Sequence, residues 1–426
     1  MENSAVYLDN QWAWWHKLLF RFACIYIVLY TTIWTWIGDL PLFSLIGEYY
    51  GKTENWLVTA ANDYIFHVKD ELVPLNGSGD TSYGYAQLCF FLLVAVVGTV
   101  IWTIFDKRKE YNTGYYWLIV LVRYYVAMMA LGYGIIKLFG LQMIFPSLSA
   151  LATPLGDLLP MRFSWYFIGY STPYQFFSGA VEVVAGLLLL FRRTSTLGAF
   201  VAASVFLNVM MLNLCYDIPV KLFSIHLFLF SSFLLIADAR RLLNFFVFNK
   251  STQPLPQIVL PKQWMRRSKV VLKIAFFILF LVFPLIRSYQ GWSSSQQAST
   301  TPKLTTGFFS VDQSQGTAVD SLRWKDIVFE PTNTGSIHTA DTLFRQRYHR
   351  AYFSYSFDTL KHTIDFKRSS MDTTALFTMQ YVMPDTNHIE LRGKIRNDSV
   401  AMTLRRENRR FQLAEKQFHW LSEANR

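Results

Sequence analysis

Seven apolar segments, each long enough to cross a lipid bilayer, constrain the fold of this chain most strongly. A helix of about 20 mostly apolar residues spans the hydrocarbon core. Such a segment must be helical, because the lipid offers its backbone no hydrogen-bond partner. The predicted spans are residues 18–36, 85–105, 116–139, 174–191, 197–214, 220–236 and 270–286. We therefore predict an all-α polytopic membrane bundle of about seven spans over residues 1–290.

Basic clusters near the ends of these segments support the number of spans. They stand at 16–17 before the first span, 106–109 after the second, 192–193 after the fourth, 240–241 after the sixth and 266–269 before the seventh. With seven spans, every cluster falls on the side that the positive-inside rule identifies as cytoplasmic. The N-terminus is then cytoplasmic, and the chain after Arg287 lies outside. These clusters explain the net charge of +11, so we expect membrane lipids and no nucleic acid as partners.

The last third of the chain has a different pattern. Residues 291–302 include the polar, low-complexity string SSSQQASTTP, which is typical of a linker. Over 303–426, short segments rich in β-formers are separated by turn residues, as in a small antiparallel sheet or barrel. The segments are WKDIVF, AYFSYSF, HTIDF, ALFTMQYVM, HIELRGKI, VAMTLRR and RFQL. We predict a mostly β extracytoplasmic domain, with Phe418 and Trp420 closing the barrel.

Two long loops on the outer side have their own patterns. Residues 55–68 (NWLVTAANDYIFHV) are amphipathic and predict a helix in the membrane interface. Residues 141–173 contain the aromatic string SWYFIGYSTPYQFF, which continues beyond them. Tyrosine and tryptophan of this kind favour the membrane interface. Both loops either pack in this interfacial belt or form a lid over a pocket that opens outward.

Two cations interrupt the third span. Arg123 and Lys137 are 14 residues apart, and at about 100° per residue they return to nearly the same helix face. Ala127, Ala130 and Gly134 lie between them on that face, and such small residues permit close contact with another helix. Lys137 either snorkels to the headgroups as an anchor or works inside the bundle.

A carboxylate interrupts the fourth span. Ser178, Glu182 and Gly186 follow one another at intervals of four, so Glu182 lies on a small, polar stripe that faces other helices. An isolated carboxylate in lipid must be protonated or paired. Arg123 and Lys137 are its candidate partners, either in a structural ion pair or in a site that exchanges protons.

The fifth and sixth spans meet at a polar connection. Asn213 ends one span, Asp217 and Pro219 resemble a helix start, and Lys221 and His226 follow in the next span. A histidine inside a span is costly, so it either relays protons, binds a ligand carbonyl or joins helices by hydrogen bonds. We expect these groups and the charges of the third and fourth spans to line a polar cavity in the outer half of the bilayer.

Several strings are similar to the DoxX-like integral membrane protein family, in its long form with an extracytoplasmic domain. They are NGSGDTSYGYAQ (76–87), RYYVAMMALGYGIIKLF (123–139), GAVEVVAGLLLLFRRTSTLGA (179–199), NVMMLNLCYDIPVKLFSIHL (208–227) and the ending FHWLSEANR. The resemblance implies a compact helical bundle in the bacterial inner membrane and distant kinship with the membrane part of vitamin K-dependent carboxylases. In those enzymes a lysine in a motif like GYGIIKL is the base near the quinone, and Lys137 occupies the similar position. Their large lumenal domain has no counterpart here.

The leading hypothesis is that the protein binds a quinone or similar lipid-soluble molecule and is linked to quinone-dependent oxidoreduction. No metal site is predicted, because the cysteines and histidines lack metal-ligand spacing. The predicted catalytic residues are Lys137, Glu182 and His226, and the predicted cofactor-binding residues are Arg123, Asn213, Asp217 and Lys221. The alternative is a non-enzymatic envelope scaffold that binds a protein partner through its β domain.

Overall fold

The computed structural model describes residues 12–36, 38, 41–253, 261–299, 306–315, 324–340, 342–396, 398–415 and 420–421. The chain divides into two compact units, Met1–Leu138 with Phe176–Leu285 and Phe139–Gln175 with Ile286–Arg426. We call the first the helical unit and the second the barrel unit. This division differs from the predicted one, because residues 139–175 group with the β-rich part and not with the bundle.

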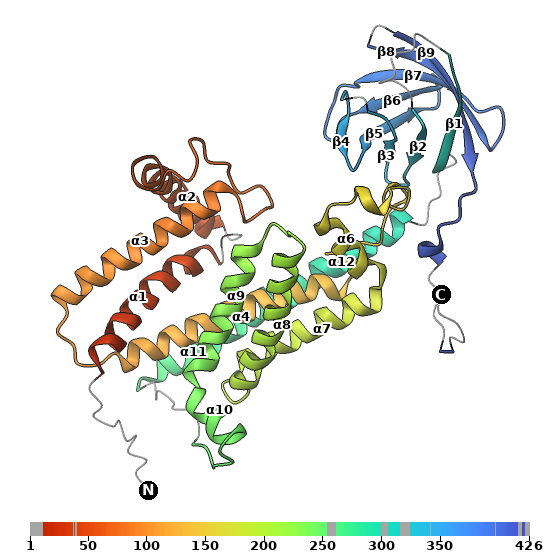
Figure 1. The fold of residues 1–426 in the computed structure, drawn as a ribbon. Helices are drawn as coiled ribbons and strands as arrows, with labels where there is room; N and C mark the ends of the chain where they lie inside the picture. Colours follow the sequence, from red (N-terminus) through yellow and green to blue (C-terminus); the bar gives the residue numbers. More distant parts are fainter. Residues whose placement is uncertain are drawn as a thin grey trace. The chain divides into compact units, whose positions relative to one another are not determined.

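Helices coincide with all seven predicted spans (Figure 1). Within the described residues, six stretches are long and apolar enough to cross a membrane. They are α1 with η1 (Trp14–Thr31, Ile33–Thr35), α3 (Ser82–Phe105), α4 (Asn112–Leu138), α7 (Thr172–Leu190), α8 (Ser195–Cys215) and the α11–η4–α12 stretch. The seventh candidate is the pair α9 (Lys221–Ala237) and α10 (Ala239–Phe246), which is bent by 70°. The predicted membrane bundle is thus confirmed as a fold class.

Helix α4 is the most buried of these spans. Its buried positions include Val126, Ala127, Ala130, Leu131 and Gly134, the periodicity of one face of a helix. It packs against α1, α8, α9 and η4 (Figure 1). Because α4 has neighbours on several sides, any polar side chain on its buried face must find a partner inside the unit.

The basic clusters gather at one end of the helical unit. The backbone N–H of Trp12 donates to the carbonyl of Lys109 at 3.2 Å, which joins the start of α1 to the α3–α4 connection. The guanidinium of Arg192, after α7, lies over an aromatic ring at the start of α4. Arg241, in α10, donates to Thr196 at the start of α8 at 3.4 Å. We call this the basic end of the unit.

The amphipathic segment 55–68 is helical, as predicted. It forms the second half of α2 (Pro41–Ala61) and the π-helix η2 (Asn62–Phe66). The helix ends at His67, whose φ of 49° is left-handed and whose N–H donates to the carbonyl of Asn62. Its place in the membrane interface stays a prediction.

The seventh span is longer than predicted. The helices α11 (Gln263–Phe277), η4 (Ile278–Val282) and α12 (Phe283–Ser299) follow one another without a break. The segment 291–302, predicted as a linker, is therefore helical as far as Ser299, and its last residues lie outside the described part of the chain. Polar composition indicated a linker, but serine, glutamine and alanine also continue a helix that is already formed.

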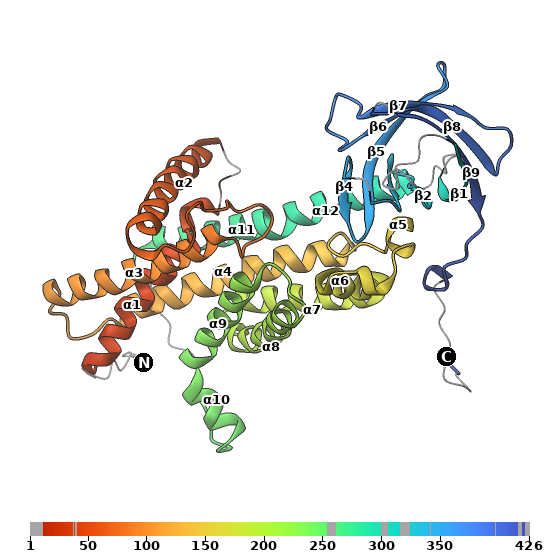
Figure 2. The ribbon, with the colours of Figure 1, turned by 45° about the horizontal axis from the view of Figure 1, so that its top comes forward.

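The barrel unit contains a closed antiparallel barrel (Figure 2). The eight strands of the ring follow the chain order β1-β2-β3-β5-β6-β7-β8-β9, with β9 paired back onto β1 and the short β4 added to β5. The strands are β1 (Gly307–Gln315), β2 (Asp326–Phe329), β3 (Thr334–Ile337), β4 (Arg345–Arg347), β5 (Arg350–Asp358), β6 (Thr363–Lys367), β7 (Phe377–Val382), β8 (His388–Ile395) and β9 (Asp398–Glu407). The predicted β domain is confirmed, and its sheet is a barrel.

Aromatic side chains fill the barrel. Strand β6 alternates, with Ile364 and Phe366 fully buried and their neighbours partly exposed, as expected where one face of a sheet packs on a core. The expectation that Trp420 closes the barrel is wrong, because its side chain is 91% exposed and backbone pairing closes the ring. Phe418 lies outside the described residues. The RFQL segment, predicted as a strand, leads into the 3-10 helix η6 (Gln412–Glu415).

Candidate functional site

An ion pair is buried where α4 and α7 cross. Lys137 and Glu182 are only 7% and 1% exposed, and the lysine Nζ donates to Oε1 of the glutamate. Gly134 and Gly179 make this crossing close. A Cβ on Gly179 would lie 2.6 Å from the Gly134 carbonyl oxygen, and a Cβ on Gly134 would lie 2.8 Å from that of Gly179. Two glycines therefore let the backbones approach until the charged side chains meet.

The pair has unused hydrogen-bonding capacity. Oε2 of Glu182 is buried and has no hydrogen-bond partner, although a carboxylate can accept several bonds. A buried acceptor without a partner is costly, and this oxygen is the position at which the carboxyl group could take up a proton. The prediction that Lys137 meets Glu182 is confirmed as geometry, and their use as a proton site stays a hypothesis.

Arg123 does not take part in this pair. It stands 14 residues before Lys137 on the same helix, which corresponds to about 21 Å along the axis. Its guanidinium carbon lies 5.2 Å from the ring centre of Tyr124, and its Nε is buried without a hydrogen-bond partner. The expectation that Arg123 is an electrostatic partner of Glu182 is therefore wrong, since a shared helix face does not imply a shared height.

His226 is fully hydrogen-bonded between α9 and α1. Its Nδ1 lies 2.6 Å from the carbonyl oxygen of Leu222, and its Nε2 lies 2.5 Å from the hydroxyl of Tyr26. A carbonyl only accepts, so Nδ1 carries the proton and Nε2 accepts from the tyrosine. The ring of Tyr30 stacks on the imidazole at 3.9 Å. This geometry fits the helix-joining alternative for His226, because both nitrogens are already used.

The connection between α8 and α9 is held by an aspartate that the sequence analysis did not select. Asp80, in the loop before α3, accepts from the backbone N–H groups of Lys221 and Leu222 at 2.7 and 3.0 Å. It therefore caps the start of α9 from another segment. Asp217 is 81% exposed at its side chain, has a left-handed φ of 50° and pairs with Lys221 at 2.7 Å. The prediction that Asp217 starts the helix is wrong, since α9 begins at Lys221.

Asn213 is part of the same connection. It is buried, and its side-chain amide lies 3.5 Å from the carbonyl of Val220. Its own carbonyl accepts from the N–H of Ile218 at 3.0 Å. Asn213 thus closes the turn between the two helices. His226 joins this connection through its bond to the carbonyl of Leu222, whose N–H donates to Asp80. Within the described residues, no hydrogen bond or ion pair joins them to the Lys137–Glu182 pair, and the single polar cavity stays a prediction.

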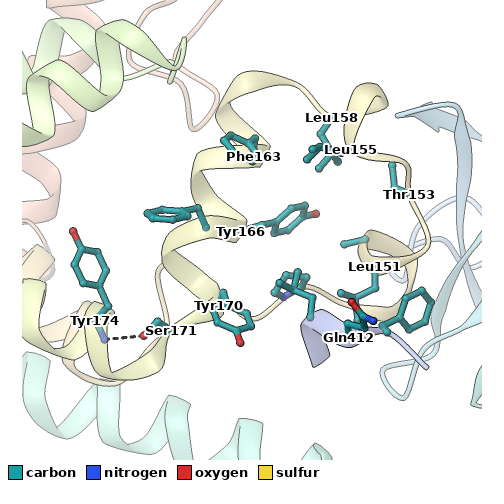
Figure 3. A pocket seen from close by; sticks show the side chains of 15 residues that line it. Leu151, Thr153, Leu155, Leu158, Phe163, Tyr166, Tyr170, Ser171, Tyr174 and Gln412 are labelled. Atoms are coloured by element: carbon teal, nitrogen blue, oxygen red, sulfur yellow. Dashed lines mark hydrogen bonds between the residues drawn. The ribbon is translucent and has the colours of Figure 1, made fainter. Parts of the chain in front are cut away.

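A large apolar pocket lies in the barrel unit instead (Figure 3). Its volume is about 840 Å³, and fifteen residues line it. They are Pro146, Ala150, Leu151, Thr153, Leu155, Leu158, Phe163, Tyr166, Phe167, Tyr170, Ser171, Tyr174, Phe411, Gln412 and Leu413. Seven come from α5 (Leu148–Leu151), η3 (Leu155–Asp157) and α6 (Pro160–Tyr170), four from the connections next to these helices, and the rest from the start of α7 and around η6. The loop 141–173 therefore folds into one wall of a pocket, and its role as a lid over an outward opening stays a prediction.

The pocket wall is fastened to the barrel by hydrogen bonds. Glu330, after β2, accepts from the backbone N–H groups of Ser149 and Leu148 at 2.7 and 3.3 Å, which caps α5. Arg162, on α6, donates to the hydroxyl of Tyr348 at 3.0 Å. These bonds hold both helices of the wall on one scaffold, as a preformed ligand site requires.

The polar groups of the pocket are neutral. No charged residue is among its lining side chains. Tyr166 points from α6 toward the wall opposite (Figure 3). Burial raises the pKa of its phenol, although Arg162 acts in the opposite direction. The phenol therefore stays protonated at neutral pH and is a hydrogen-bond donor or acceptor for a ligand.

Sequence reasoning missed Asp80, Tyr26 and the lining of the pocket. Asp80 lies within NGSGDTSYGYAQ, a turn-rich string that we used only for its resemblance to a family. Tyr26 is one of many aromatic residues in a span, and nothing in its spacing sets it apart. The pocket had a usable signal, because the string SWYFIGYSTPYQFF contains Tyr166, Tyr170 and Ser171.

Comparison with known proteins assigns no function to this chain. No family model matches the chain, and no solved structure matches it. A relative from Bacillus subtilis (strain 168), the uncharacterized protein YwoB, is 37% identical over 83 residues. The match covers 20% of this chain and 54% of that protein. It spans only about half of the relative's length, and the relative is itself uncharacterized, so it assigns no activity here.

Proposed function

We propose that this chain is an integral membrane protein that binds a lipid-soluble molecule of the quinone type. The observation that carries the proposal is the pocket of about 840 Å³ in the barrel unit, lined by aliphatic and aromatic side chains. Ligand sites are typically concave and mostly apolar, with a few polar groups that orient the ligand, and have volumes of roughly 300–1,000 Å³.

The lining residues fit a quinone. Phe163, Phe167 and Tyr170 offer aromatic rings, and the hydroxyl of Tyr166 offers a neutral hydrogen-bond donor. A quinone carries carbonyl oxygens on an apolar ring, so it needs neutral donors and no counter-ion. A bound quinone would supply two-electron redox chemistry. The residues of the chain would bind it, orient it and exclude water.

The buried pair Lys137–Glu182 is the second part of the proposal. We infer that it holds an exchangeable proton, because one carboxylate oxygen is buried without a partner. This role would link the protein to quinone-dependent oxidoreduction. The DoxX-like resemblance and a place in the bacterial inner membrane, with the barrel outside the cytoplasm, belong to the same proposal.

A titration of the purified full-length protein with a short-chain quinone tests the binding. Leu155 lines the pocket and is 68% exposed, so Leu155→Trp fills the pocket without disturbing a packed core. Leu360→Trp is the matched control, since Leu360 is 93% exposed in the same unit. We expect saturable binding by the wild type and the control, and weaker binding by Leu155→Trp.

Two results would separate the alternatives. Equal binding by all three proteins contradicts the pocket as the site. An absence of binding by the wild type contradicts the proposal as a whole and favours the envelope scaffold. Under the proposal, Lys137→Met retains quinone binding but slows quinone reduction in membranes that contain the variant.

A further inference from the structure

Three cations meet at the basic end of the helical unit without an acidic partner. They are Arg123 on α4, Arg192 after α7 and Lys273 on α11. Ring contacts bring them together, because Lys273 lies over Phe191, next to Arg192, and Tyr124, next to Arg123, packs on Phe276 of α11. Within the described residues, no carboxylate forms an ion pair with any of the three. Like charges brought together in a low-dielectric region cost free energy unless an anion compensates them.

The directions of the helices bring the three side chains toward one another. Side chains on a helix lean toward its N-terminus, and α4 and α11 both begin at the basic end. Arg123 and Lys273 therefore reach back toward Arg192, at the end of α7. Each cation lies over an aromatic ring, at 5.2 Å for Arg123, 5.1 Å for Arg192 and 3.8 Å for Lys273. These rings position the cations but carry no net negative charge to pair with them.

Buried donors without partners mark the same place. The Nε atoms of Arg123 and Arg192 are buried and have no hydrogen-bond partner. Two acidic side chains at the basic end already accept hydrogen bonds from other residues. Asp106 accepts from Trp102 at 2.8 Å, and Asp238 accepts from the Thr196 hydroxyl at 2.5 Å. Because guanidinium groups match the oxygens of a phosphate, a phosphate would satisfy donors that the chain itself leaves unused.

An apolar surface adjoins the three cations. Val271, Leu272 and Ile274, next to Lys273 on α11, are 63%, 69% and 54% exposed. In a membrane span these side chains face lipid. A molecule with a phosphate beside long acyl chains would contact both the cations and this surface. Basic pockets between spans are known to bind anionic lipid headgroups on the cytoplasmic side.

We propose that Arg123, Arg192 and Lys273 form a binding site for the headgroup phosphate of an anionic phospholipid. The occupant compensates the three charges, and its acyl chains lie along α11. The site is distinct from the pocket in the barrel unit and does not depend on the function proposed for that pocket.

Native mass spectrometry of the full-length protein in mixed micelles tests this site. The probes are phosphatidylglycerol and phosphatidylcholine, with inorganic phosphate as competitor. Arg192→Gln removes one charge of the cluster, and Arg193→Gln is the matched control, because Arg193 is exposed and one residue away. We expect Arg192→Gln to lower phosphatidylglycerol retention by about tenfold, equivalent to one charge-assisted hydrogen bond. The control should retain it as the wild type does.

Arg123→Gln and Lys273→Gln should give the same loss, so the test does not rest on one variant. Equal retention by Arg192→Gln and Arg193→Gln would overturn the proposal. Equal retention of phosphatidylglycerol and phosphatidylcholine by the wild type would also overturn it. If inorganic phosphate displaces phosphatidylglycerol completely, the site binds free phosphate and the assignment to a lipid is wrong.

Discussion

Arg123 and Lys137 stand on one helix and nearly one helix face, yet their surroundings are opposite. Lys137 meets a carboxylate at a crossing of two glycines. Arg123 lies beside two further cations and an aromatic ring. The difference arises from the neighbouring helices and not from α4 itself. The charges of Lys137 and Glu182 neutralise each other within the protein. Cations without an acidic partner need a counter-ion that the protein does not supply.

The largest effect is expected for breaking the pair. Lys137→Met leaves Glu182 as a buried group without its cation, and removal of one partner from a buried pair typically costs about 3–5 kcal/mol. The double variant Lys137→Met/Glu182→Gln should recover much of the free energy of unfolding. Chemical denaturation in detergent measures both. A double variant whose loss equals the sum of the single losses would contradict a direct interaction.

A smaller loss is expected from widening the helix crossing. Gly179→Ala places a Cβ 2.6 Å from the Gly134 carbonyl oxygen and 2.7 Å from the Cβ of Lys137. Overpacking of this kind costs about 1–3 kcal/mol. Gly132→Ala, on the partner helix α4, is the control, because a Cβ there has no neighbouring atom within 4 Å. Similar melting temperatures for the two variants would show that the close approach is not needed.

The hydrogen bond between Tyr26 on α1 and His226 on α9 should contribute less to the free energy of unfolding. Tyr26→Phe removes the hydroxyl that donates to Nε2 of His226, and one hydrogen bond contributes about 1 kcal/mol net. Tyr49→Phe is the control, since Tyr49 is 69% exposed. The free energy of unfolding measures the difference. A loss of activity by Tyr26→Phe with unchanged stability would instead support the catalytic role first predicted for His226.

The smallest effect on stability is expected at Arg123 in neutral detergent. Arg123→Gln removes a charge that repels its neighbours and has no acidic partner, so the change should stay within about 0.5 kcal/mol. The comparison with Lys137→Met in the same detergent is the measurement. A loss at Arg123 as large as that at Lys137 would show that Arg123 has a partner inside the protein.

Much of the architecture could be predicted from the sequence. Apolar length alone identifies spans, because an apolar segment of about 20 residues crosses the lipid as a helix. The meeting of Lys137 with Glu182 also followed from periodicity, since small residues on both helices predict a close contact. The position of each residue along the bundle axis could not be predicted from periodicity, and so Arg123 was assigned the wrong partner. The cap of α9 by Asp80 joins segments 141 residues apart, and no local pattern reports such a distant contact.

The pocket shows the other limit of sequence reasoning. Its aromatic wall was recognised as one of two alternatives, but the contribution of Phe411, Gln412 and Leu413 was not. Those residues were predicted to belong to a strand. Their place beside residues 146–174 depends on how the end of the barrel folds back, which is a tertiary property.

The central claim is that the pocket of the barrel unit holds a lipid-soluble molecule. The most direct measurement is organic extraction of the full-length protein purified from membranes, followed by mass spectrometry of the extract. The account predicts a quinone-like molecule in roughly equimolar amount in the wild type, and much less of it in Leu155→Trp. An extract of the wild type that contains only bulk phospholipid would contradict the account.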